Sequence, residues 1–99
     1  MVKKVLQKSQ LKESQSIPNY NDPNIYWATF DLGCSSAIIS AGGKLVSLEK
    51  SNPHKIQFIF LKDKNIEKVV NDYWADKLEV KARTFFDNTK MLKNRIYSE

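Results

Sequence analysis

The sequence predicts an α+β domain with a small three-stranded sheet, in the order strand, helix, strand, strand, helix, helix. Three observations carry this prediction. A dense run of β-branched and aromatic residues at 25–30 precedes a short small-residue segment that ends at two glycines. Two further strand-like runs, 44–49 and 55–61, are separated only by a turn. The last third of the chain carries apolar residues at helical spacing.

The first expected strand covers residues 25–30, between Pro23 and Gly33. Turn-forming residues on both sides are typical of a strand's limits. Apolar side chains occur at both parities of this run. We therefore expect a central strand with both faces covered.

The first helix is expected over residues 32–41, with Asp31 as its N-cap. Gly42 and Gly43 should end it, one of them in the left-handed position after the C-cap. Small side chains in its middle would allow close packing on the sheet. The helix is expected to face the sheet through Leu32, Ile38, Ile39 and Ala41.

Residues 44–49 and 55–61 are expected to form an antiparallel hairpin, because the turn at 50–54 is short and contains Asn and Pro. Phe58 and Phe60 fall on one face of the second strand. We expect this pair of rings to lie in the core under two helices.

Two helices complete the domain. The first is capped by Asp63 or Asn65 and ends near Asp76 and Lys77. Its apolar residues at helical spacing are Ile66, Val69, Val70, Tyr73 and Trp74. The second runs over residues 81–97, and its expected buried stripe is Ala82, Phe85, Phe86, Thr89, Leu92 and Ile96. We expect Trp74 to help lock both helices onto the sheet.

The chain before residue 25 differs in composition from the rest. Residues 1–24 are polar and basic, rich in Ser, Gln and Asn, and they include Pro18 and Pro23. They predict an N-terminal arm with a short helix at 2–13 and a turn-rich linker at 18–23. The folded domain is expected over 25–99, with the arm dispensable for folding but needed for partner binding.

Composition points to one folded domain. The chain has 99 residues, of which 41% are hydrophobic and 27% charged. A single cysteine excludes an intramolecular disulfide and fits a reducing compartment. The N-terminus lacks the apolar run of a signal peptide, and nothing approaches a membrane span in length. We expect a cytoplasmic protein without a membrane partner.

Catalytic and metal-binding patterns are missing from the sequence. Cys34 and His54 are its only cysteine and histidine, well short of a zinc ligand set. Gly42-Gly43 is not followed by the Lys-Ser/Thr pair of a phosphate loop. We expect no catalytic residues, no metal and no cofactor, with Cys34 as a buried structural side chain.

The charge balance allows an anionic partner. Sixteen Lys and Arg against 11 Asp and Glu give a net charge of +5. Aromatic residues on the expected strands could form a stacking platform beside lysines, or they could form core. The candidate nucleic-acid-binding residues are Lys50, Lys55, Lys62, Lys64, Arg83, Lys90, Lys93, Tyr26 and Trp27.

Several runs together resemble a family of short phage and bacterial proteins known as a domain of unknown function. They span residues 25–98 and include Thr29-Phe30-Asp31-Leu32, Gly43-Lys44-Leu45-Val46, Phe58-Ile59-Phe60, Val70-Asn71-Asp72-Tyr73-Trp74 and Leu92-Lys93 with Ile96-Tyr97. The helix after Asp31 departs from the pattern, since it has Gly33, Cys34 and serines where more Ala and Leu are expected. The resemblance implies a setting in phages and mobile genetic elements and carries over no catalytic residue.

Two functions are open at this point. The first is a non-catalytic accessory protein of a phage or mobile element that binds single-stranded DNA or RNA, a replication enzyme, or both. The second is a protein-interaction module or inhibitor that docks on a host or element-encoded protein.

Overall fold

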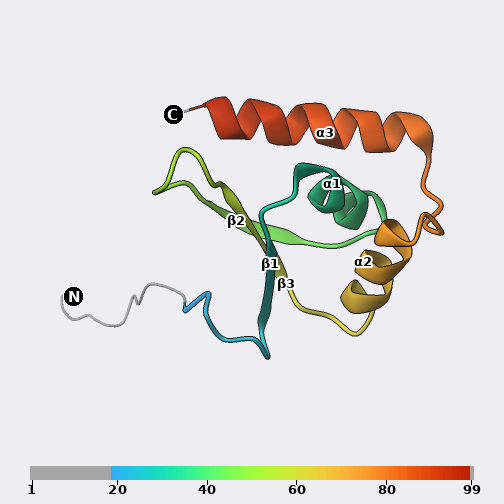
Figure 1. Ribbon diagram of the computed structural model, residues 1–99, viewed down its shortest axis with the longest axis horizontal. Coiled ribbons are helices and arrows are strands. Elements are labelled where there is room, and N and C mark those ends of the chain that lie inside the picture. Colours follow the sequence, from blue (N-terminus) through green and yellow to red (C-terminus); the bar gives the residue numbers. More distant parts are fainter. Residues whose placement is uncertain (1–18, 99) are drawn as a thin grey trace, which may run out of the picture.

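A computed structural model of the chain describes residues 19–98 (Figure 1). The predicted α+β class and the predicted order of elements are confirmed. The elements are β1 (Tyr26–Thr29), α1 (Leu32–Ser40), β2 (Leu45–Glu49), β3 (Gln57–Leu61), α2 (Ile66–Trp74) and α3 (Ala82–Tyr97). The helix expected at 2–13 lies outside the described residues.

The sheet has the strand order β1-β3-β2, and both neighbouring pairs are antiparallel. The β2–β3 hairpin is therefore as predicted. The placement of the first strand in the centre is wrong, because β3 occupies that position and β1 lies at an edge. In β1, Trp27 lies opposite Phe60 on the helix side, while Ala28 lies opposite Ile59 on the other face. Ala28 is a small apolar residue on that second face. It gives the strand apolar residues at both parities, which is why the sequence predicted a central strand.

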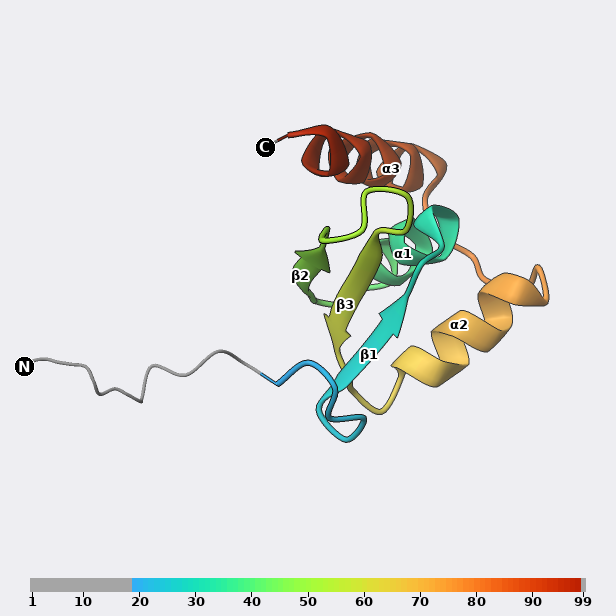
Figure 2. The same ribbon diagram turned by 60° about the vertical axis from the view of Figure 1, so that its left-hand side comes forward.

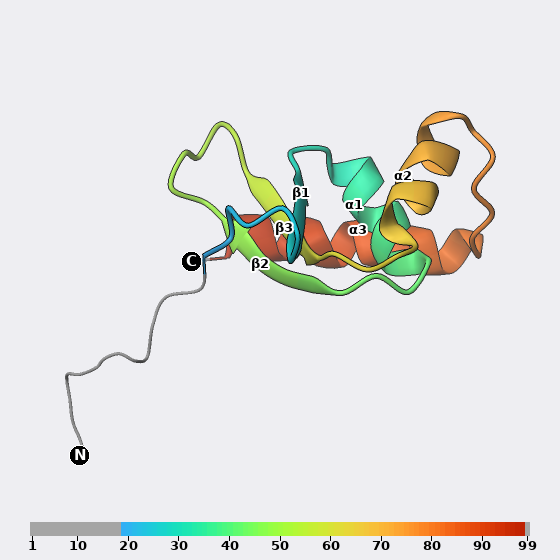
Figure 3. The same ribbon diagram turned by 90° about the horizontal axis from the view of Figure 1, so that it is seen from below.

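Helix α1 lies inside the molecule, between the sheet, α2 and α3 (Figures 1 and 3). Figure 2 shows α3 running across the top of α1, on the side away from the strands. The core lies where α1 meets β3, and Phe58 and Phe60 are both buried there as predicted. The buried cluster consists of Cys34, Ile38, Phe58, Phe60, Ile66 and Leu92.

Both predicted ends of α1 are confirmed. Asp31 caps the N-terminus, where its Oδ1 accepts a hydrogen bond from the Cys34 amide at 2.7 Å. At the C-terminus Gly42 has a φ of 100°, a conformation that glycine adopts without a Cβ penalty. Its amide donates to the Ile39 carbonyl, and the Gly43 amide donates to the Ile38 carbonyl, as in a Schellman motif.

Two serines of α1, Ser36 and Ser40, contact α3, whereas the small side chains of this helix were expected to pack on the sheet. Ser36 is buried, and its Oγ accepts a hydrogen bond from the Thr89 hydroxyl at 2.9 Å. Near the end of α1, Asn88 donates its amide to the Ser40 Oγ at 3.0 Å. These two contacts fix α3 along α1 and satisfy polar groups that would be costly to bury without partners.

The prediction of buried positions for Trp74 and Phe86 is wrong. Their side chains are 61% and 60% exposed, and Tyr97 is 84% exposed. Phe86 and Tyr97 are exposed because α3 packs on the narrow helix α1, so only a thin stripe around Leu92 is covered. Trp74 is the last residue of α2, where its neighbour Tyr73 packs against the core instead. Neighbouring positions on α3 turn by about 100° per residue, which carries Phe86 out of the contact although Phe85 is partly buried.

A pair of substitutions tests this division between core and surface. Leu92→Ala removes a fully buried side chain and should lower the free energy of unfolding by about 2–5 kcal/mol. Trp74→Ala removes a larger but exposed side chain and should cost about 1 kcal/mol or less. Urea unfolding followed by circular dichroism measures both. A Trp74→Ala protein as unstable as Leu92→Ala would place the indole back in the core.

Candidate nucleic-acid interface

One side of α3 carries two lysines with an aromatic side chain at each end. Phe86, Lys90, Lys93 and Tyr97 follow one another at intervals of four, three and four residues. Residues three and four apart on a helix are neighbours on its surface, so these four form a single stripe. All four are exposed. The Lys90 Nζ lies over the Phe86 ring, 5.2 Å from its centroid.

A groove lies at the C-terminal end of this stripe. It has a volume of about 320 Å³ and lies between the β1–α1 junction, the hairpin turn and the end of α3. Phe30 from the junction is 52% exposed, and the Lys55 Nζ lies 4.9 Å from the centroid of its ring. The lining residues are Phe30, Leu32, Pro53, His54, Lys55, Ile56, Phe58, Ile96 and Tyr97.

Tyr97 belongs both to the stripe on α3 and to the groove, so the two features are continuous. We call them together the aromatic–lysine surface, defined by Phe30, Lys55, Phe86, Lys90, Lys93 and Tyr97. It brings together three of the predicted cationic residues with three exposed rings. The ion pairs found between residues 19 and 98 include none of these lysines.

Lys50, another predicted contact residue, has a structural partner. Its Nζ donates hydrogen bonds to the carbonyls of Arg95 at 2.9 Å and Ser98 at 2.7 Å. A cation at a helix C-terminus satisfies carbonyls that lack partners within the helix and interacts favourably with the helix dipole. Lys50 thereby joins the hairpin to the end of α3 and holds the two sides of the groove together.

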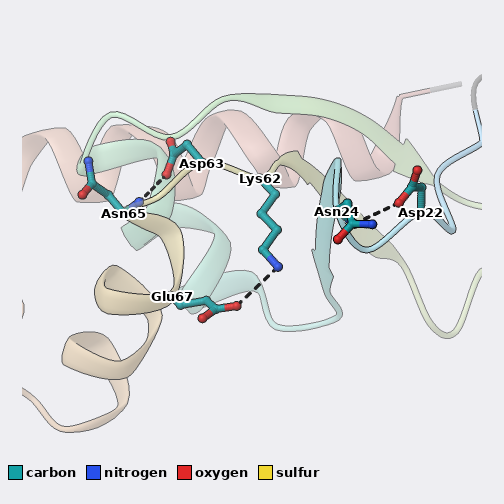
Figure 4. Close-up of polar contacts among 6 residues, drawn as sticks. All are labelled: Asp22, Asn24, Lys62, Asp63, Asn65 and Glu67. Carbon is teal, nitrogen blue, oxygen red and sulfur yellow. Dashed lines mark hydrogen bonds and ion pairs between the residues drawn. The ribbon is translucent and has the colours of Figure 1, made fainter.

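Lys62 and Lys64 lie at the other end of β3, far from the groove. Lys62 forms an ion pair with Glu67 at 3.5 Å, at the start of α2 (Figure 4). Asp63 is beside it, and its Oδ1 accepts a hydrogen bond from the backbone amide of Asn65 at 2.8 Å. The carboxylates at this corner oppose phosphate binding. The same close-up shows Asp22, which likewise accepts from the Asn24 amide in the turn before β1.

The two predicted stacking residues on β1 are occupied by contacts within the protein. Trp27 is partly buried and packs against the core cluster. The Tyr26 ring meets the Tyr20 ring edge-on, with centroids 5.0 Å apart. Arg83, on the outer side of α3, pairs with Asp87 at 3.7 Å. The structure therefore leaves Tyr26, Trp27 and Arg83 outside the aromatic–lysine surface.

Cys34 is placed where a thiol is unreactive. Burial first, and then the Asp31 carboxylate, raise the pKa of its thiol from 9.0 to about 11, although a hydrogen bond with the Trp74 side chain acts in the opposite direction. The thiol is therefore protonated at neutral pH, in spite of its position at a helix N-terminus. Within residues 19–98 no group of three His, Cys, Asp or Glu side chains is arranged to hold a metal ion.

One known protein family matches almost all of the residues that the structure describes. Residues 24–98 match the model of the domain of unknown function DUF5659, and the chain belongs to this family. No curated protein and no solved structure matches the chain. In the part of the chain that the structure describes, no helix is long and apolar enough to cross a membrane.

Sequence reasoning missed the rings of the aromatic–lysine surface. The sequence places Phe30 on an expected strand, Phe86 in an expected core stripe and Tyr97 at the end of an expected helix, and none of them is among the predicted contact residues. A signal was present in the spacing, because each ring on α3 lies four residues from a lysine. A stripe that combines rings with lysines is unlike the purely apolar stripe that a core needs.

The raised pKa of Cys34 gives a pH-dependent stability. The pKa of the thiol is higher in the folded protein than its unfolded value of 9.0. The protonated thiol therefore contributes its full share to the free energy of unfolding below pH 9, and this share is lost as the pH rises towards 11. The loss should be on the order of 2 kcal/mol. Burial and Asp31 also raise the pKa of Tyr73, which acts in the same direction.

The measurement is urea unfolding at pH 8 and pH 10.5 for the wild type and Cys34→Ala. The wild type should lose more stability between these pH values than the variant. Equal losses would mean that the thiol ionises as readily in the folded protein as in the unfolded one.

Proposed function

We propose that this protein is a non-catalytic accessory factor that binds single-stranded nucleic acid through the aromatic–lysine surface. Its resemblance to short phage and bacterial proteins supports a setting in a phage or mobile element. Small basic proteins of such elements serve replication or interfere with host machinery. A replication enzyme is accordingly the partner that we expect beside the nucleic acid.

One observation carries this proposal: exposed aromatic rings and lysines lie side by side along one continuous surface. Every base has a π-face, so rings bind single strands without requiring a sequence, while lysines contact the phosphates. Duplex DNA keeps its base faces stacked and would meet only the lysines. The combination of rings and cations therefore favours single strands.

The dimensions of the surface suit a short stretch of strand. Phe86 and Tyr97 are eleven residues apart on α3, which corresponds to about 16 Å along the helix axis. Phosphates of one DNA strand rise by about 3.4 Å per nucleotide when the bases stay stacked. The stripe therefore covers several nucleotides, and the groove with Phe30 and Lys55 extends it at one end.

Charge reversal tests the proposal with a matched control. Lys90→Glu with Lys93→Glu should weaken binding of a labelled single-stranded oligonucleotide and reduce the slope of log affinity against log salt by about 1.4, at roughly 0.7 per lost phosphate contact. Lys62→Glu with Lys64→Glu changes the net charge equally at the far corner. Fluorescence anisotropy with DNA and RNA at several salt concentrations measures both.

The control pair should bind nearly as the wild type does. Equal weakening by the two double variants would mean that binding depends on net charge alone and that α3 holds no specific binding site. Absence of binding to either nucleic acid at low salt, by the folded full chain, would overturn the proposal.

A second candidate function, docking on a partner protein, is favoured by the exposure of Trp74. Its ring packs edge-on against Tyr73, with centroids 5.0 Å apart, and Tyr73 lines an apolar groove of about 230 Å³ between α2 and α3. Exposed tryptophans beside apolar pockets are frequent hot spots of protein interfaces. The other residues of the groove are Ala37, Asp76, Leu78, Val80, Ala82 and Phe85.

Variants separate this candidate from the first. Isolation of complexes from the native host with tagged wild type, Trp74→Ala and Tyr97→Ala should show a partner that the Trp74 variant alone loses, if docking uses this groove. Oligonucleotide affinity should remain unchanged in Trp74→Ala. A partner retained equally by all three proteins would exclude Trp74 from docking.

A further inference from the structure

We infer that the groove at the end of α3 is a subsite for one unpaired base, which stacks against Tyr97 and Phe30 while Lys55 contacts the adjoining phosphate. This subsite rests on the proposed function, and it names the part of the nucleic acid that is recognised. Lys90 and Lys93 on α3 need only the phosphates of the strand. The groove needs a base that has left its stack.

The composition of the groove matches a base. Its floor is formed by apolar side chains, including Leu32, Ile56 and Ile96, and buried Phe58 lies beneath. The ring faces of a base are apolar and its edges are polar, so an apolar floor with an open rim can bury the faces and leave the edges in water. A volume of about 320 Å³ lies at the small end of ligand sites, which span roughly 300–1,000 Å³.

The rim supplies aromatic faces and positive charge. Tyr97 is 84% exposed and Phe30 is 52% exposed, so both rings have area available to a ligand. Lys55 and His54 lie on the hairpin side, and none of the lining residues in the described range 19–98 carries a carboxylate. A nucleotide is aromatic and anionic at once, which this combination complements in both respects.

Lys55 is held where a phosphate next to the bound base would lie. Lys55 lines the groove, and its ammonium lies over the Phe30 ring, 4.9 Å from the ring centroid. Lysine has a compact charge on a flexible stem, so the ammonium can move from the ring to a phosphate while its Cα stays in place. The Phe30 face is then open to the base.

The walls of the groove are fixed before any ligand binds. Lys50 bonds the carbonyls of Arg95 and Ser98 and thus holds the hairpin against the end of α3. On the opposite wall, the Asp31 amide donates to the Thr29 hydroxyl at 3.1 Å, next to Phe30. A preformed site loses less conformational entropy on binding than one that must be ordered by its ligand.

The decisive probe is a pair of labelled single-stranded oligothymidylates of equal length, one intact and one with abasic sites replacing the central bases. Both carry the same phosphates. The wild-type full chain should bind the intact strand roughly 5- to 150-fold more tightly, the range expected for one stacked base. Tyr97→Ala should strongly reduce this difference, yet retain the abasic-strand affinity and its salt dependence.

Two further variants make the assignment specific. Phe30→Leu, which keeps an apolar wall but removes the ring, should reduce the preference for the intact strand. Trp74→Ala removes an exposed aromatic outside the groove and should leave the preference unchanged. Circular dichroism of each variant confirms that it is folded.

The outcomes distinguish the subsite from the proposed function. Equal binding of intact and abasic strands by the wild type would overturn the subsite and leave phosphate binding by α3 standing. If Tyr97→Ala weakens both strands equally, the groove holds no base. If neither strand binds, the proposed function fails together with the subsite.

Discussion

The enclosure of α1 is the constraint on which the rest of the structure depends. This helix touches the sheet, α2 and α3, and residues 34–38 are all buried. Large side chains on every side would hold these partners apart, which accounts for the serines, alanine and glycine of α1. At Gly33 a Cβ would collide with the Tyr73 hydroxyl, so α2 approaches α1 where a side chain is missing.

Burying serines requires that their hydroxyls have partners. Ser35 donates to the Asp31 carbonyl at 2.8 Å, and Ser36 donates to the Leu32 carbonyl at 3.0 Å, one turn back along the helix. Ser36 also accepts from Thr89 on α3. Polar contacts are directional, so they set how α3 lies along α1 more strictly than apolar packing alone would. The serines of α1 therefore have a structural purpose.

The exposed rings follow from the same arrangement. Because α3 rests on a narrow helix, only the stripe around Leu92 is covered, and the neighbouring side of α3 stays open with Phe86 and Tyr97. Lys50 then fixes the end of α3 to the hairpin and forms the groove. The aromatic–lysine surface is thus a consequence of how the helices stack, and large exposed apolar groups of this kind often mark interaction sites.

Local chemistry made much of the fold predictable from the sequence. Asp31 as a cap, Gly42 in its left-handed conformation and the two phenylalanines of β3 depend on residues close in sequence or on strand alternation. The wrong predictions concern how the helices and strands pack against one another. Helical spacing shows that Phe86 and Trp74 are near apolar stripes, but only the identity of the packing partner decides how wide the buried stripe is. Whether β1 is central or at an edge depends equally on pairing across the chain.

The candidate site was predictable only in part. The charge of Lys55, Lys90 and Lys93 predicts them as contact residues. The structure brings them together beside the rings of Phe30, Phe86 and Tyr97, which the sequence does not predict as part of the site. The same reasoning could not separate them from Lys50 or Lys62, whose partners Arg95, Ser98 and Glu67 come from other elements. A lysine available for a phosphate and a lysine used within the fold have the same sequence signature.

Stacking of α3 on α1 leaves the aromatic–lysine surface exposed, and we propose that this surface binds the nucleic acid. Nuclear magnetic resonance of the ¹⁵N-labelled full chain, titrated with a single-stranded oligonucleotide at low salt, tests this most directly. Shift changes should concentrate at 30–32, 53–56 and 86–97, and should be small at Val46, Ile59 and Leu61 on the far side of the sheet. The largest changes on that far side, or none anywhere at saturating oligonucleotide, would contradict the claim.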